Sequence, residues 1–284
     1  MAADPPDGIV SAMRRNSVDI RAMALFLTVA FVAAGALGAL QPATRIPSEV
    51  IQLTQFGPAL GVGLAALLWP GRVRELLAGP VPGRSRQGVL LLVTAPLIIA
   101  LSVGAYAALT GDARSTRPGA PFALIAAAQL IGACGEEIGW RCFLQPLLRT
   151  RVGPLAASVA VGVVWGVWHV QVFAGHPVYA GAFMTAAVSM SVVMGWALEG
   201  RRASRLLLAG GFHALINLGM LLFMDEESGA VLPMVLFGAS CLAAAGLWTW
   251  TSAGRARSAA PEPAQATAQA PAPARIPPIM DDVR

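Results

Sequence analysis

Three short motifs place ionisable side chains inside otherwise apolar stretches of this sequence. The motifs are GACGEEIGWR, VVWGVWHV and GGFHALINLG, and they contain Glu136, Glu137, Arg141, His169, His213 and Asn217. Charge in the hydrocarbon core of a bilayer is costly, so an ionisable residue inside an apolar span indicates a functional site. Carboxylates and imidazoles can exchange protons or bind metal ions, and an amide can donate hydrogen bonds. The motifs therefore predict acid–base or ion chemistry at membrane depth.

The spacing within the motifs predicts which side chains share a helix face. Glu137 and Arg141 are four residues apart, so they can form an ion pair that lowers the cost of burying both. Glu136 is rotated by about 100° from Glu137 and is not paired by that arginine. His213 and Asn217 are also four residues apart and point the same way.

The composition is that of a membrane protein. The chain has 284 residues, of which 56% are hydrophobic and 12% charged, and its mean hydropathy is +0.65. Soluble domains are nearer one quarter charged, and disordered chains are less hydrophobic. A spanning helix needs about 20 apolar residues. We predict an all-α polytopic protein, a bundle of about eight transmembrane helices near 22–40, 50–69, 88–109, 122–148, 154–173, 181–199, 205–223 and 231–251.

The distribution of arginine predicts the orientation. The chain has no lysine, and most loop arginines fall on one side if the N-terminus lies inside. Arg45, Arg114 and Arg117 are the loop arginines on the other side. Cytoplasmic loops are enriched in basic residues. We therefore predict an integral protein of the plasma (inner) membrane with both termini in the cytoplasm. Although the net charge is +5, arginine clusters between apolar runs do not indicate a nucleic-acid partner.

The sequence divides into three parts. Residues 1–20 form a polar N-terminal segment, and residues 21–251 form the transmembrane helical domain. Residues 252–284 are rich in alanine and proline, a composition typical of a disordered tail, which we place in the cytoplasm.

Helix geometry predicts that the motifs meet. At a rise of about 1.5 Å per residue, Glu136, His169, His213 and Asn217 all lie near the middle of the bilayer, as one shared site requires. Two pairs of glycines, Gly135 with Gly139 and Gly162 with Gly166, are expected to let the fourth and fifth helices approach closely. Trp140, Trp165 and Trp168 are interpreted as packing or cavity-lining residues, and His176 as a loop residue.

The three motifs together resemble those of the CPBP family of intramembrane proteases, which includes the CAAX prenyl endopeptidases and the bacteriocin-processing or Abi proteins. The family's first motif, two glutamates and an arginine four residues after the second, matches Glu136, Glu137 and Arg141. In its second motif, Trp165 stands where phenylalanine is usual and His169 keeps the histidine. His213 and Asn217 match the third. The resemblance covers roughly residues 45–223 and implies an intramembrane endopeptidase of about eight spans.

The residue types fit a hydrolytic mechanism. Peptide hydrolysis requires an activated water and hydrogen-bond donors for the oxyanion. We expect Glu136 and His169 to position and deprotonate the water, and His213 and Asn217 to donate to the oxyanion. Glu137 and Arg141 are expected to hold the fourth helix and orient Glu136. This division resembles the glutamate-dependent mechanism proposed for the family.

A metal-dependent mechanism remains open on the sequence alone. Glu136, His169 and His213 would supply a His₂Glu set for Zn²⁺, with water at the open position. The H-E-x-x-H signature is absent, and no cofactor follows from the sequence with certainty.

Two other functions use the same residues. A transporter or channel would use the buried carboxylates and histidines for proton or ion coupling, and an immunity or scaffold protein would keep them without catalysis. The expected partners of the protease are the lipid bilayer and a membrane-associated peptide or protein substrate.

Overall fold

The computed structural model describes residues 7–77, 85–112, 115–199, 204–224 and 229–258, and all regular elements in these ranges are helices. The predicted all-α class is therefore confirmed. The α-helices are α1 (Asp7–Thr44), α2 (Gly57–Leu68), α3 (Pro70–Leu77), α4 (Ser85–Thr110), α5 (Phe122–Gly139), α6 (Gln145–Arg149), α7 (Pro154–Trp168), α8 (Pro177–Ala197), α9 (Arg205–Phe223) and α10 (Val231–Ser258).

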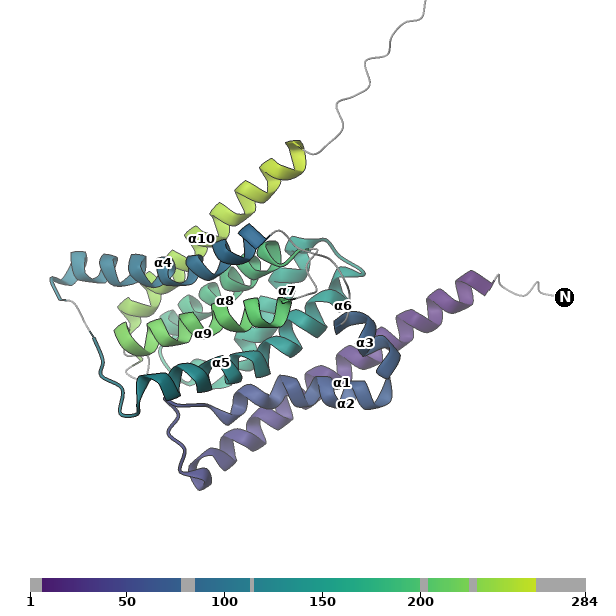
Figure 1. Cartoon of the computed structure of the whole chain (residues 1–284), viewed down its shortest axis with the longest axis horizontal. Coiled ribbons are helices and arrows are strands. Elements are labelled where there is room, and N and C mark those ends of the chain that lie inside the picture. Colours follow the sequence, from purple (N-terminus) through teal and green to yellow (C-terminus); the bar gives the residue numbers. More distant parts are fainter. Residues whose placement is uncertain (1–6, 78–84, 113–114, 200–203, 225–228, 259–284) are drawn as a thin grey trace, which may run out of the picture.

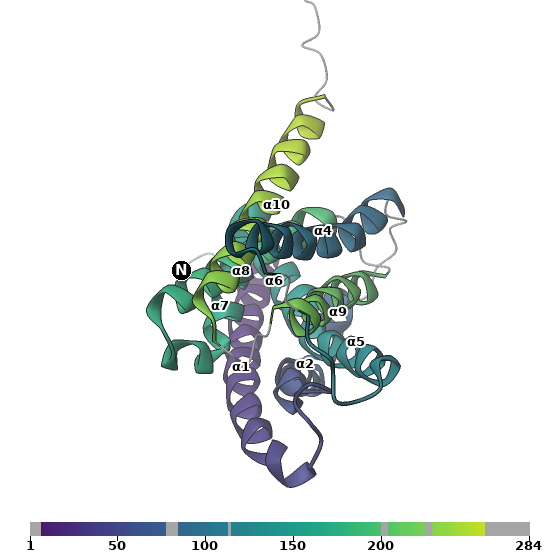
Figure 2. The ribbon, with the colours of Figure 1, turned by 90° about the vertical axis from the view of Figure 1, so that its left-hand side faces the viewer.

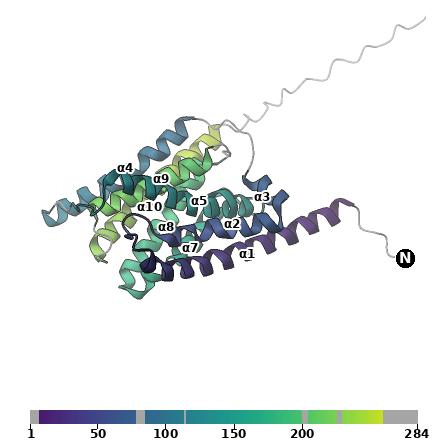
Figure 3. The same ribbon diagram turned by 60° about the horizontal axis from the view of Figure 1, so that its bottom comes forward.

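The long helices run back and forth between two ends of an elongated bundle (Figure 1). α1 packs against α2, α5 packs against α9, and α8 packs against both α7 and α10. α4 lies against α9 and α10 on the opposite side of the bundle from α1, as the turned view in Figure 2 shows. In Figure 3, α1 runs along one edge of the molecule, with α2 and α3 beside it. Segments far apart in sequence are thereby placed around a common interior.

The predicted number of spans is confirmed only in part. Six helices are long and apolar enough to cross a membrane: Arg15–Thr44, Arg86–Thr110, Phe122–Arg149, Pro177–Ala197, Arg205–Phe223 and Val231–Ala253. The other two predicted spans correspond to the shorter apolar helices Leu53–Leu68 and Pro154–Trp168. Large apolar side chains such as Leu67, Leu97 and Leu207 are more than 60% exposed on the outer surface, which gives the bundle a face suited to lipid tails. The chain is an integral membrane protein.

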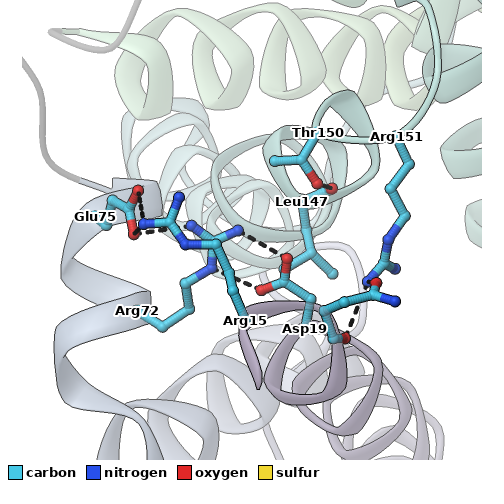
Figure 4. Close-up of polar contacts among 8 residues, drawn as sticks. Arg15, Asp19, Arg72, Glu75, Leu147, Thr150 and Arg151 are labelled. Atoms are coloured by element: carbon cyan, nitrogen blue, oxygen red, sulfur yellow. Dashed lines mark hydrogen bonds and ion pairs between the residues drawn. The ribbon is translucent and has the colours of Figure 1, made fainter. Parts of the chain in front are cut away.

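Arginine side chains hold together the end of the bundle that carries α3 and α6, which we call the arginine end (Figure 4). Arg72 donates to both carboxylate oxygens of Asp19 on α1, over 2.7 and 2.9 Å. Arg151, in the turn after α6, donates to the side-chain oxygen of Asn16 over 2.6 Å. These contacts fix the first helix against α3 and against the turn that follows α6.

The glycine pairs do permit close approach, but to different helices from those expected. A Cβ at Gly139 on α5 would lie 2.5 Å from Pro58 on α2, and one at Gly162 on α7 would lie 2.6 Å from Val188 on α8. The expectation that these glycines bring the fourth and fifth predicted spans together is wrong. The spacing identifies a small-residue face but does not identify its partner.

The segment boundaries differ in detail from the sequence pattern. α1 begins at Asp7 and therefore includes much of the polar segment 1–20. α10 continues to Ser258, so the alanine- and proline-rich stretch begins within its last turns. Residues 259–284, which carry most of the predicted tail, lie outside the described residues, and the three-part division stays a prediction.

Candidate active site

Both glutamates of the first motif lie where the helix changes type. α5 is followed after Gly139 by a π-helical turn, Trp140–Leu144, before α6 completes the span. Such turns inside α-helices are uncommon and occur frequently at functional sites. Glu136, Glu137 and Arg141 are at most 2% exposed. The last turn of α5 and the π-helical turn that follows it therefore place three ionisable groups in the interior of the bundle.

Glu137 is the centre of a buried ion cluster that joins α5 to α9. Arg141 Nη1 donates to Glu137 Oε1 over 3.4 Å, and Arg141 Nε lies 3.3 Å from Glu137 Oε2. The predicted pairing is thus confirmed. His213 Nδ1 lies 2.8 Å from Glu137 Oε1, a contact that the spacing could not predict because His213 belongs to another helix. A buried charge is stable only with partners, and Glu137 has two.

Trp165 connects this cluster to Glu136. Its indole Nε1 donates to Glu136 Oε2 over 2.8 Å, and the Arg141 guanidinium lies 4.4 Å from its ring centroid. The same ring meets His213 edge-on, with centroids 5.2 Å apart. The sequence predicts a packing or cavity-lining role for Trp165, and the structure adds a direct hydrogen bond to the glutamate. Phenylalanine, the residue usual at this motif position, has no such donor.

His169 lies at the end of α7 and not within a helix. The helix stops at Trp168, and His169 has φ −79° and ψ 60°. Its Nδ1 lies 2.9 Å from the carbonyl oxygen of Trp165, which satisfies one of the carbonyls left unpaired at a helix end. Trp168 and Phe183 both pack edge-on against the imidazole, each with its ring centroid 4.9 Å away. The ring is therefore held at one edge, and its Nε2 is left for other contacts.

Asn217 is held by a polar residue that sequence reasoning missed. Asn217 Nδ2 donates to Gln129 Oε1 over 3.1 Å, and Gln129 Nε2 donates to the carbonyl oxygen of Glu49 over 3.2 Å. Gln129 lies on α5 seven residues before Glu136, about two turns along the same face. A polar residue on that face of an apolar span was the signal that could have identified it.

A cavity of about 490 Å³ brings the predicted residues together. Glu136, His169, His213 and Asn217 all line it, although they come from three separate segments of the chain. Glu137 and Arg141 do not line this cavity and lie behind it, in contact with His213 and Trp165. His176, interpreted as a loop residue, lies in the turn before α8 and also lines the cavity. The walls are otherwise rich in side chains that form hydrogen bonds, among them Gln52, Gln55, Gln129, Gln171 and Tyr179.

The donor set proposed for zinc is not assembled in this arrangement. Among the described residues, no three His, Cys, Asp or Glu side chains gather closely enough to hold a metal ion. The three side chains proposed as ligands are therefore not gathered as a His₂Glu site in this arrangement, and no step below is derived through a metal.

Comparisons with known proteins agree with the resemblance seen in the motifs. Residues 118–219 match the family model described as "Type II CAAX prenyl endopeptidase Rce1-like", a stretch that contains all three motifs. The chain is also 24% identical over 228 residues to lysostaphin resistance protein A of Staphylococcus aureus strains Newman and COL. The alignment covers 76% of this chain and 54% of those proteins, so the chain spans about half the length of the curated relatives it matches. The resemblance to the CPBP family is confirmed.

Proposed function

We propose that this chain, whose residues 118–219 match the type II CAAX prenyl endopeptidases, is an intramembrane endopeptidase that cleaves a membrane-associated polypeptide. The observation that carries the proposal is the convergence of Glu136, His169, His213 and Asn217 on one polar cavity. The transporter and scaffold alternatives are not favoured, because the matching family model describes an endopeptidase.

Glu136 is the general base in this proposal. Its Oε2 accepts the Trp165 indole hydrogen bond, so we assign the water to Oε1. His169 shares the water: if its Nδ1 carries the proton donated to the Trp165 carbonyl, Nε2 is an acceptor. Glu136 removes a proton from the water as its oxygen attacks the scissile carbonyl, and then delivers that proton to the leaving amine. A positioned carboxylate of this kind contributes about 10²–10⁴-fold to the rate.

His213 and Asn217 stabilise the oxyanion. The Asn217 amide carries two N–H groups, and one of them is held by Gln129, so the other is assigned to the oxyanion. His213 donates through Nε2 when its ring is protonated. That state makes the buried group neutral overall, because the charges of Arg141 and His213 then balance those of Glu136 and Glu137. Glu137 and Arg141 act as positioning residues: Glu137 orients His213, and Arg141 supports Glu137 and stacks on Trp165.

The proposed membrane placement follows from the arginine distribution. The arginine end carries the loops that the sequence assigns to the cytoplasm. We place the chain in the plasma membrane with both termini in the cytoplasm.

The test compares cells that express the wild-type chain, Glu136→Gln or Glu75→Gln. New protein N-termini in the membrane fraction are identified by mass spectrometry, so that no substrate has to be chosen beforehand. Glu75 is 45% exposed at the arginine end, which makes Glu75→Gln a matched substitution remote from the cavity.

We expect the wild type and Glu75→Gln to generate the same new termini, and Glu136→Gln to reduce them by about 10²-fold or more. Equal expression and gel-filtration profiles of the three proteins provide the folding control. Cleavage by Glu136→Gln at the wild-type rate would rule out the proposed mechanism.

A further inference from the structure

The cavity is built from the loops at one end of the bundle, which we call the site end. Ser48, Glu49 and Gln52 come from the segment between α1 and α2, and Thr116 comes from the segment between α4 and α5. The short connection between α7 and α8 supplies Gln171, Gly175 and His176, and Gly229 precedes α10. Each of these segments connects two consecutive helices at the same end of the bundle. The cavity therefore opens at the site end.

Loop contacts confirm that these segments form one surface. The Glu49 carboxylate accepts a hydrogen bond from the Gly119 backbone N–H over 3.2 Å. The Thr116 backbone N–H donates to the carbonyl oxygen of Leu222, in the last turn of α9, over 2.7 Å. The mouth of the cavity is thus framed by loops that are bonded to one another across long distances in the sequence.

The arginines lie at the opposite end. The described arginines in the half of the bundle away from the cavity include Arg15, Arg21, Arg72, Arg74, Arg86, Arg149, Arg151 and Arg205. Arg45 and Arg117 are the described arginines at the site end, and neither lines the cavity. Basic residues in short loops accumulate on the cytoplasmic side of a membrane. The site end accordingly faces away from the cytoplasm.

We infer that the cavity receives its substrate from the non-cytoplasmic side of the membrane, so that the substrate is an exported polypeptide segment. This inference rests on the proposed endopeptidase function and specifies which polypeptides can reach the cavity. A C-terminus that is prenylated in the cytoplasm lies on the wrong side of the membrane for this opening.

The lining also limits the chemistry of the substrate. Glu49 and Glu136 are its acidic residues, and no arginine is among the described residues that line it. The many amide and hydroxyl groups can hydrogen-bond to an extended backbone, as peptide-binding grooves do. Like charges placed close together repel. The site therefore takes an uncharged or basic peptide segment in preference to an acidic one.

The sidedness is tested by thiol labelling in intact bacterial cells with a membrane-impermeant maleimide. Ser48→Cys places a thiol at the cavity and Thr150→Cys places one at the arginine end. Both replace an exposed hydroxyl residue, so the pair is matched. The wild-type chain gives the background from Cys134, Cys142 and Cys241. Gln52→Cys is a second site-end position if Ser48→Cys does not fold.

We expect the site-end thiol to label fully in intact cells, with no increase after permeabilisation, and Thr150→Cys to label only after permeabilisation. The opposite pattern would overturn the inference. Because labelling does not require catalysis, it can fail while the Glu136-dependent cleavage stands, and the reverse is also true.

The proteolytic products give an independent readout of the same inference. The new termini that depend on Glu136 should map to exported proteins or to the non-cytoplasmic segments of membrane proteins, with few acidic residues beside the cleaved bond. Termini in cytoplasmic segments would overturn it.

Discussion

At the arginine end of the bundle, charged side chains face one another, whereas at the site end, polar side chains face a cavity. Arg72 bonds both Asp19 oxygens and also Glu75, and Asp19 raises the pKa of the Arg72 guanidinium above its ordinary value. Arg149 forms an ion pair with Glu199. Carboxylates from other segments of the chain hold several of these cations, so this end locks the helices together.

At the site end, neutral donors and acceptors hold the cavity residues, and no arginine is among the described residues of the cavity wall. Glu136 is held by an indole, Asn217 by Gln129, and Gln129 by the backbone of Glu49. None of these contacts neutralises the Glu136 carboxylate. A carboxylate held by neutral donors keeps its ability to accept a proton, which an ion-paired one largely loses. In the proposed mechanism, this difference separates the structural charges of the arginine end from the carboxylate that acts as the base.

The Arg141–Glu137–His213 cluster lies between the two regions. Arg141 lines a second cavity of about 280 Å³ at the arginine end, together with Arg149, Glu199 and Arg205, while His213 lines the first. Glu137 bonds both residues and is itself 0% exposed. The cluster therefore forms a partition between the two cavities, and we expect its removal to have the largest effect on stability.

Replacing an arginine within this partition and an arginine at the surface of the arginine end should lower the free energy of unfolding by very different amounts. Arg141→Met leaves Glu137 with a single partner in the interior, and breaking a buried pair costs about 3–5 kcal/mol. Arg15→Met removes an ion pair whose side chains are 63% and 45% exposed, and such pairs contribute about 1 kcal/mol or less. Unfolding of both variants in detergent gives the two values. Similar costs would show that Glu137 does not depend on Arg141.

Sequence reasoning predicted the components of this cluster better than its connections. The Glu137–Arg141 pair follows from helix periodicity, because both residues belong to one helix. The His213–Glu137 and Trp165–Glu136 contacts do not, since they depend on how α5, α7 and α9 are packed. The glycine faces have the same explanation. Their spacing can be recognised in the sequence, but the helices they contact depend on how the bundle packs.

The break at the end of α7 shows a second limit. Apolar composition extends through 154–173, and this predicts one long span. The helix nevertheless stops at Trp168, because His169 adopts a non-helical ψ and its side chain bonds the Trp165 carbonyl. Hydropathy cannot predict this contact between the His169 side chain and a backbone carbonyl, although the resulting helix end brings His169 to the cavity.

The second largest effect is expected from the indole that holds Glu136. Trp165→Phe keeps the aromatic ring and restores the residue usual in the family, but it removes the hydrogen bond to the carboxylate. Hydrogen bonds to charged groups contribute about 1.5–3 kcal/mol, so we expect cleavage to fall by about 10–100-fold. The measurement is the initial rate at which each variant generates the new termini that depend on Glu136.

Trp248→Phe is the matched control for that substitution. Its indole donates to Thr94 Oγ1 over 3.2 Å on the packing between α10 and α4, away from the cavity. This change should lower stability slightly and leave the rate as it was. If Trp165→Phe cleaves as fast as Trp248→Phe, then the indole does not position the base.

The smallest of these effects tests whether the loops at the cavity mouth support the oxyanion donor. Gln129→Leu removes the acceptor that holds Asn217, whereas Gln129→Glu keeps an acceptor and loses the donor to the carbonyl oxygens of Glu49 and Val50. A neutral hydrogen bond contributes about 1 kcal/mol, which corresponds to a drop of about fivefold in kcat for the leucine variant. The glutamate variant should recover part of that loss.

Gln145→Leu provides the comparison at the other end of the bundle. Gln145 donates to Ser158 Oγ over 3.2 Å at the arginine end, so its loss should change the unfolding temperature without changing kcat. A purely structural role for Gln129 would give the same result as Gln145, with stability and not turnover affected. If kcat instead falls only in Gln129→Leu and recovers in part in Gln129→Glu, then Gln129 positions Asn217 during the reaction. The hydrogen bonds from the Glu49 backbone through Gln129 to Asn217 would then contribute to turnover.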